Sequence, residues 1–149
     1  VASVIESDGD AFSYIITGDS TSELKIIKGG PGGQYSSSGI FTSSIFDPGF
    51  EISVNRLFVN FSEATQASIK FQVAIADPVN NSCDDANFFY VGPDGTSNTY
   101  FNEDSPIPTS DDGLDFENPG RCLRYRAFLS SADPTQTPVL FDISFNYSL

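Results

Sequence analysis

The strongest constraint on the fold is an alternation of apolar and polar side chains near the end of the chain. From 139 to 148 the sequence reads Val-Leu-Phe-Asp-Ile-Ser-Phe-Asn-Tyr-Ser, so that one face collects Val139, Phe141, Ile143, Phe145 and Tyr147. Successive side chains of a strand point to opposite faces. This period of two predicts a strand with one face in a core and the other in water.

The same period recurs earlier in the chain, and turn residues separate the segments that show it. Within 68–76, for example, Ile69, Phe71, Val73 and Ile75 are predicted to face inward, with Lys70 and Gln72 outward. Further strands are predicted at 12–17, 23–28, 35–46, 56–61, 88–91, 99–101 and 123–129. No window favours an amphipathic helix. We therefore predict an all-β protein, an antiparallel β-sandwich or jelly roll, in which 12–17 and 23–28 form an N-terminal β-hairpin.

Length and charge limit the classes of function. The 149 residues suit one domain, with 1–30 as the hairpin segment and 35–149 as the core. Acidic residues number 20 against 7 basic ones, which disfavours nucleic acid and anionic membrane surfaces as partners. The chain has no His, so it cannot supply a Ser-His-Asp or Cys-His apparatus by itself. A pair of carboxylates for glycoside hydrolysis would need a deep cleft, and we expect a protein that is not an enzyme.

The chain contains 2 Cys residues, Cys83 and Cys122. We predict that they form a disulfide, which would place the protein in an oxidising compartment outside the cell or at its surface. Closing a loop of about 40 residues would stabilise the fold by roughly 4 kcal/mol in the chain-entropy model. The alternative is a pair of buried thiols acting as small apolar side chains.

Four segments together resemble a known kind of module. They are Tyr35-Ser-Ser-Ser-Gly-Ile-Phe-Thr-Ser-Ser-Ile-Phe-Asp-Pro-Gly, Ala67-Ser-Ile-Lys-Phe-Gln-Val-Ala, Phe89-Tyr-Val-Gly-Pro-Asp-Gly-Thr and the run from Arg124 to Leu140. In this order they look like a jelly-roll module of bacterial cell-surface proteins, including type IV pilin-like subunits. The resemblance covers about 35–149. It implies a non-enzymatic extracellular domain, the exposed head of a filament subunit (such as a minor pilin) or an adhesin, whose partners are other subunits or a surface receptor.

Acidic clusters in predicted loops are candidate calcium ligands, because Ca²⁺ takes several carboxylate and carbonyl oxygens. The first choice is Asp111, Asp112 and Asp115, followed by Asp84 and Asp85. None of these runs has the spacing of an EF-hand loop. The alternative is a set of solvated acidic loops, and no cofactor is required by the sequence.

Aromatic and arginine side chains are the candidate ligand-binding residues. Phe89, Tyr90, Tyr100 and Phe101 flank the predicted turn at 92–95, and exposed rings stack on sugars. A carbohydrate-binding module, with or without calcium, is therefore the alternative function; packing in the core is the other role open to these rings. Arg121, Arg124 and Arg126 are candidates for an anionic partner or for pairing with the protein's own carboxylates.

Overall fold

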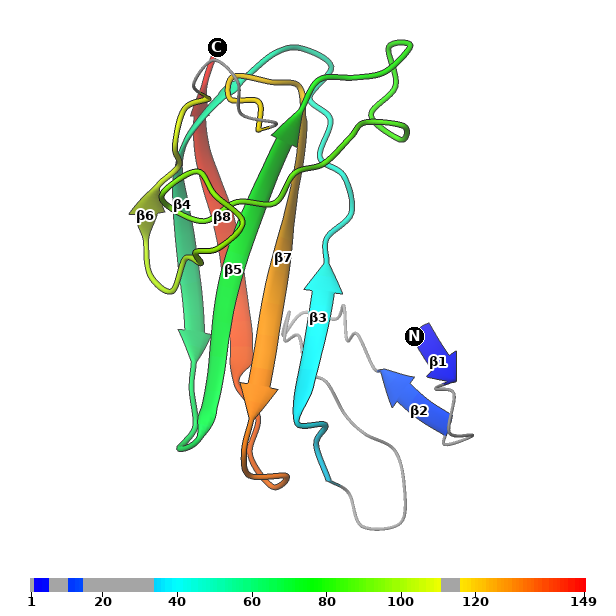
Figure 1. The fold of residues 1–149 in the computed structure, drawn as a ribbon, viewed down its shortest axis with the longest axis vertical. Helices are drawn as coiled ribbons and strands as arrows, with labels where there is room; N and C mark the ends of the chain where they lie inside the picture. Colours follow the sequence, from blue (N-terminus) through cyan, green and yellow to red (C-terminus); the bar gives the residue numbers. More distant parts are fainter. Residues whose placement is uncertain (1, 6–10, 15–33, 111–115) are drawn as a thin grey trace. The chain divides into compact units, whose positions relative to one another are not determined.

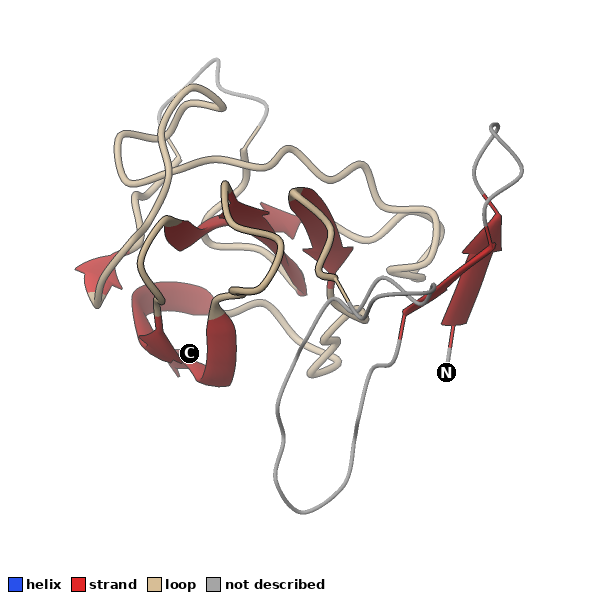
Figure 2. Cartoon of the chain, turned by 90° about the horizontal axis from the view of Figure 1, so that it is seen from below, coloured by secondary structure: helices blue, strands red, loops and turns tan. Residues whose placement is uncertain are grey.

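The computed structural model describes residues 2–5, 11–14, 34–110 and 116–149, and these residues form strands and loops without any helix (Figure 2). Accordingly, the described residues contain no helical segment of the length and hydropathy that a membrane crossing requires. The strands are β1 (Ala2–Ile5), β2 (Ala11–Tyr14), β3 (Ser38–Thr42), β4 (Ser53–Ser62), β5 (Ala67–Ala76), β6 (Ser105–Pro106), β7 (Cys122–Ser131) and β8 (Val139–Ser148). The predicted all-β class is confirmed.

Two three-stranded antiparallel sheets contain the long strands (Figure 1). One has the order β3-β7-β5 and the other the order β6-β4-β8. In the first, the Ser68 and Ser130 hydroxyls are 2.8 Å apart and form a side-chain hydrogen bond between β5 and β7. Each long strand thus lies beside a partner that is distant in sequence.

The N-terminal part forms a separate antiparallel pair of β1 and β2, in which Ala2 lies opposite Tyr14 and Ile5 opposite Ala11. The hairpin predicted from 12–17 and 23–28 overlaps β2 in its first arm. Its second arm lies outside the described residues, so that hairpin stays a prediction.

The chain divides into two compact units, and the long strands contribute residues to both. The first consists of Val1–Ile40, Val59–Ile69 and Phe128–Ile143, and its buried side chains include Ile69, Leu129 and Leu140. The second consists of Phe41–Phe58, Lys70–Ala127 and Ser144–Leu149. Its most deeply buried large side chains are Phe71, Phe101, Phe116, Ile52 and Leu57. All residues of the candidate site belong to the second unit.

Burial of β5 differs from the sequence prediction on one face. The predicted inward residues Ile69, Phe71, Val73 and Ile75 are all buried, as expected. Gln72, predicted to face water, is also buried, with 4% of its surface exposed. The outward face of β5 is covered because a later loop folds over it and supplies hydrogen-bond acceptors for the Gln72 amide.

The apolar face of β8 is only partly covered. Phe145 contacts Tyr125 of β7, with ring centroids 6.2 Å apart. Phe141 and Tyr147, however, keep 39% and 43% of their surface exposed, although the alternation predicted both inside. Leu140, which the alternation places on the opposite face, is buried with 4% of its surface exposed.

A buried amide joins β4 to the segment that precedes β7. Asn118 is 1% exposed, and its side-chain oxygen accepts a hydrogen bond from the Val54 N–H at 3.0 Å. Its side-chain nitrogen donates to the carbonyl oxygens of Val54 at 2.9 Å and Pro108 at 2.8 Å. The side chain therefore satisfies both backbone groups of Val54, as a neighbouring strand would.

Candidate functional site

The segment 88–101 lies along the edge of β5 that β7 does not occupy. It touches this edge through two pairs of residues, Phe71 with Phe101 and Val73 with Val91. Each pair exchanges two backbone hydrogen bonds of 2.8–3.0 Å. The strands predicted at 88–91 and 99–101 are therefore not regular strands, because each meets β5 at a single residue.

A tight turn between these two contacts is held by side chains. Gln72 donates its amide hydrogens to the carbonyl oxygens of Ser97 at 2.9 Å and Thr99 at 3.0 Å. Asp94 accepts hydrogen bonds from the Thr99 hydroxyl and from the N–H and hydroxyl of Thr96. These bonds, the one from the Thr99 hydroxyl first, hold the pKa of the Asp94 carboxyl below its usual value.

Gly92 is required where this turn begins. A Cβ atom at position 92 would overlap the backbone carbonyl group of Thr99. The turn also places Gly95 at φ 78°, a left-handed conformation that glycine adopts without strain. The turn predicted at 92–95 is confirmed, and its N–H to O bond from Gly95 to Gly92 measures 3.1 Å.

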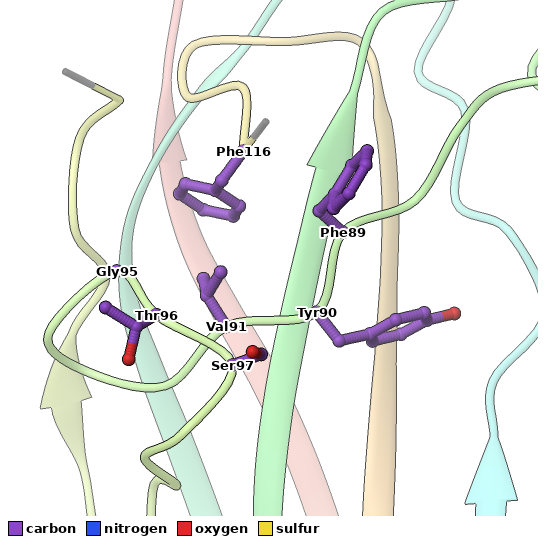
Figure 3. Close-up of a pocket in the computed structure, with 7 residues that line it drawn as sticks. All are labelled: Phe89, Tyr90, Val91, Gly95, Thr96, Ser97 and Phe116. Carbon is purple, nitrogen blue, oxygen red and sulfur yellow. The ribbon is translucent and has the colours of Figure 1, made fainter. Parts of the chain in front are cut away.

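A pocket of about 180 Å³ opens beside this turn (Figure 3). Its lining residues are Phe89, Tyr90, Val91, Gly95, Thr96, Ser97 and Phe116. Val91 and Phe116 are buried at 4% and 1% exposure, whereas the Phe89 ring remains 39% exposed. Figure 3 shows the ring of Tyr90 extending sideways from the pocket while Phe89 and Phe116 stand on the same side of the turn. The pocket thus combines the aromatic residues Phe89, Tyr90 and Phe116 with hydroxyl groups from the turn.

Positive side chains on the outer faces of β5 and β7 stack on rings of the 88–101 segment. The Arg126 guanidinium lies 3.7 Å from the centroid of Tyr90, and the Lys70 ammonium lies 3.7 Å from that of Tyr100. Arg124 is 5.4 Å from the Phe88 centroid, and its guanidinium also donates to the carbonyl oxygen of Ser43. Such contacts contribute about 0.5–2 kcal/mol each. They hold the segment against the sheet.

Arg126 has one feature that the stacking does not explain. Its Nε atom is buried and has no hydrogen-bond partner. Of the arginines in the described part of the chain, Arg121 pairs with a carboxylate, Asp47, through two bonds of 2.7 and 2.9 Å. Pairing with the protein's own carboxylates, one expectation for Arg121, Arg124 and Arg126, is seen at Arg121. The hydrogen bonds from Arg121, followed by the N–H of Gly49, lower the pKa of Asp47.

The predicted ligand-binding residues are distributed over three environments. Phe89 and Tyr90 line the pocket, and Tyr100 lies against Lys70. Phe101 is 1% exposed and packs in the core, which was the other role open to these rings. It is inward because it pairs with Phe71 at the edge of β5.

The predicted calcium ligands are not brought together in the described part of the chain. Asp84 and Asp85 are exposed in the turn after Cys83. Asp111, Asp112 and Asp115 lie outside the described residues. Among residues that the structure describes, no three acidic or cysteine side chains are grouped closely enough to hold a metal ion. The calcium site remains a prediction.

The predicted disulfide is present. Cys83 and Cys122 are bonded, with Cα atoms 5.5 Å apart and a sequence separation of 39. Both are buried beside Ala76, and Phe88 packs against this cluster. The bond therefore fixes the start of the 88–101 segment to β7.

Sequence analysis missed three residues that shape the site. Gln72 and Asp94 hold the turn, and Phe116 forms a wall of the pocket. Asp94 carried a usable signal, because Asp followed two positions later by Thr commonly forms a side-chain-to-backbone turn. Gln72 and Phe116 gave none, since their partners lie far away in the sequence.

Comparison of the chain with protein-family models, with characterised proteins and with solved structures finds no match. The functional argument therefore rests on the residues and their geometry.

Proposed function

We propose that this chain is a non-enzymatic extracellular β-sandwich domain of the jelly-roll kind, which works by contact with a partner. In this proposal it forms the exposed head of a pilin-like filament subunit or of a surface adhesin. The resemblance of 35–149 to cell-surface modules motivates the proposal. The contact between Tyr125 of β7 and Phe145 of β8 supports it, because residues of the two sheets meet there as they do inside a sandwich.

The observation that carries the proposal is the anchored aromatic segment 88–101. It is fixed to β7 by the Cys83–Cys122 bond and to the edge of β5 by paired backbone hydrogen bonds. Rings on a rigid support lose little conformational entropy when a partner binds, so they are efficient contact residues. The disulfide supports an oxidising compartment, where surface proteins are found.

Intact mass and peptide mapping of the protein purified from its natural source test this proposal. We expect an oxidised Cys83–Cys122 pair and release of the domain from intact cells by an added protease. An N-methylated hydrophobic segment upstream of Val1 would specify the filament subunit. Reduced cysteines in a protein that stays inside protease-treated cells would refute the extracellular proposal.

A carbohydrate-binding module is the second candidate, and the pocket beside Phe89 favours it. Pyranose rings stack their C–H faces on exposed aromatic rings, and hydroxyl side chains pair with sugar hydroxyls. Both kinds of group line this pocket. A glycan array probed with the purified chain tests this candidate: binding of a defined glycan is expected, and its absence from every tested class of glycan would refute it.

A further inference from the structure

The charge of the pocket narrows the class of ligand. None of its seven lining residues is an acid, a lysine or an arginine. The Arg126 guanidinium is stacked on the Tyr90 ring and the Asp94 carboxylate accepts hydrogen bonds from Thr96, so a charge of each sign touches a lining residue. The chain as a whole carries a formal charge of -13, which repels polyanions. An uncharged ligand fits this environment best.

The volume of the pocket limits the size of the ligand. Pockets for drug-sized ligands usually enclose about 300–1,000 Å³. This pocket encloses about 180 Å³, which is less than the lower end of that range. It therefore has room for one six-membered ring with its substituents and not for a run of several sugar residues.

The groups at the pocket suit a pyranose ring. Phe89 is 39% exposed and offers an aromatic face, while the buried Phe116 and Val91 provide apolar walls. The exposed Ser97 has its carbonyl oxygen engaged by Gln72, and none of the described residues hydrogen-bonds its hydroxyl. Its hydroxyl is thus available to a ligand hydroxyl, whereas the Thr96 hydroxyl is already bonded to Asp94.

The turn that carries Ser97 is fixed before any ligand arrives. Gln72 holds the carbonyls of Ser97 and Thr99, and Asp94 holds both ends of the 94–99 stretch. A site that is already ordered loses less entropy on binding, which allows even a small ligand to bind with measurable affinity.

We infer that the pocket binds one neutral pyranose residue, exposed at the end or on a branch of a glycan, stacked on Phe89 and hydrogen-bonded to the Ser97 hydroxyl. This inference rests on the second candidate function above and names the ligand of that site. The inference predicts recognition of a single terminal sugar. Recognition of an extended glycan along a groove would instead need several aromatic side chains in a row.

The test uses saturation-transfer NMR and titration of the whole chain with a panel of neutral monosaccharides. For the sugar that binds, the matching di- and trisaccharides with the same terminal residue are titrated too. We expect all three lengths to bind with affinities within about twofold of one another, because additional residues lie outside the pocket. Affinity that rises about tenfold with each added residue would overturn the inference while leaving the carbohydrate-binding candidate in place.

Two substitutions locate the site. Phe89→Ala is expected to lower the affinity about tenfold, the loss of roughly one aromatic stacking contact. Ser97→Ala is expected to lower it about threefold to tenfold, the loss of one hydrogen bond. Phe50→Ala is the matched control, because Phe50 is 49% exposed and does not line the pocket. It should leave the affinity unchanged, and thermal unfolding of each variant verifies that the fold is retained.

The remaining outcomes are distinct. Saccharide binding that survives Phe89→Ala places the sugar elsewhere and overturns the inference alone. Absence of binding by every saccharide removes the inference together with the carbohydrate-binding candidate, and leaves the adhesin or filament head. Binding of an apolar peptide that no monosaccharide displaces would assign the pocket to a protein partner and overturn the inference as well.

Discussion

Replacing the buried Asn118 by Asp should lower the free energy of unfolding by an amount that depends on pH. In the native protein the amide oxygen accepts one hydrogen bond from Val54, and the amide nitrogen donates two, to Val54 and Pro108. An ionised carboxyl can keep the accepted bond. It cannot donate, so its second oxygen would face two carbonyl oxygens at a position that is 1% exposed.

The magnitude follows from the groups that lose their partners. Each buried polar group left without a hydrogen bond costs about 1–3 kcal/mol, and an unpaired buried charge adds to this cost. We therefore expect Asn118→Asp to lower the free energy of unfolding by roughly 4–5 kcal/mol at pH 7, at the upper end of single substitutions. Asn118→Ala should cost roughly 3–5 kcal/mol at every pH, because it removes all three bonds and introduces no titratable group.

The sign of the pH dependence distinguishes the two variants. Burial beside two carbonyl oxygens raises the folded-state pKa of the introduced carboxyl above its unfolded value of about 3.9. The stability supplied by the protonated form is fully present below about pH 3.9 and is lost as the pH rises through the folded pKa. Between the two values the deficit relative to wild type grows by about 1.4 kcal/mol per pH unit.

Urea unfolding followed by circular dichroism between pH 3.5 and pH 8 measures this. Asn60→Asp, at an exposed position of β4, is the control for an added negative charge on the surface. The reasoning would be refuted if the deficit of Asn118→Asp were the same at pH 4 and pH 7. A cost for Asn118→Ala of less than about 1 kcal/mol would contradict the assigned hydrogen bonds.

Three further predictions concern stability. Replacing Cys83 and Cys122 by Ser should lower the free energy of unfolding by about 4 kcal/mol, measured by urea titration, and an unchanged midpoint would contradict it. Gly92→Ala should lower the free energy of unfolding by about 3 kcal/mol, because the added Cβ would overlap Thr99. Gly49→Ala should lower it by about 1 kcal/mol, because the added Cβ meets nothing within 4 Å but the backbone has a φ of 86°. Scanning calorimetry of both glycine variants should give the larger loss at Gly92. Hydrogen bonds lower the folded-state pKa of three carboxyls below their unfolded pKa of about 3.9. The stability that these ionised carboxyls provide is therefore present above about pH 3.9 and is lost as the pH falls below that value. Replacing each Asp by Asn should remove this acid sensitivity, as measured by urea titration at several pH values. These carboxyls belong to Asp47, Asp94 and Asp133.

Local patterns were sufficient to predict the long strands. The alternation at 68–76 matches β5 at Ala67–Ala76, and that at 139–147 matches β8 at Val139–Ser148. The cysteine count was sufficient for the disulfide, because a pair of cysteines allows one intramolecular bond. These features depend on residues close in sequence or on elimination, both of which a single sequence contains.

The candidate site was predictable only in part. The aromatic character of 88–101 was visible, but a period of two says which residues share a face, not what covers it. Gln72 looked like a solvent-facing residue because its acceptors, Ser97 and Thr99, come from a distant loop. Asn118 gave no signal for the same reason, since its partners Val54 and Pro108 are brought to it by the fold.

The strand order also determines when the protein can fold. β5 takes β7 as its neighbour and β4 takes β8, so each of these pairs forms only after the later strand has been synthesised. A chain that emerges N-terminus first exposes apolar residues of β4 and β5 until β7 and β8 follow. The Cys83–Cys122 bond can form only at this stage, because its second cysteine is the first residue of β7.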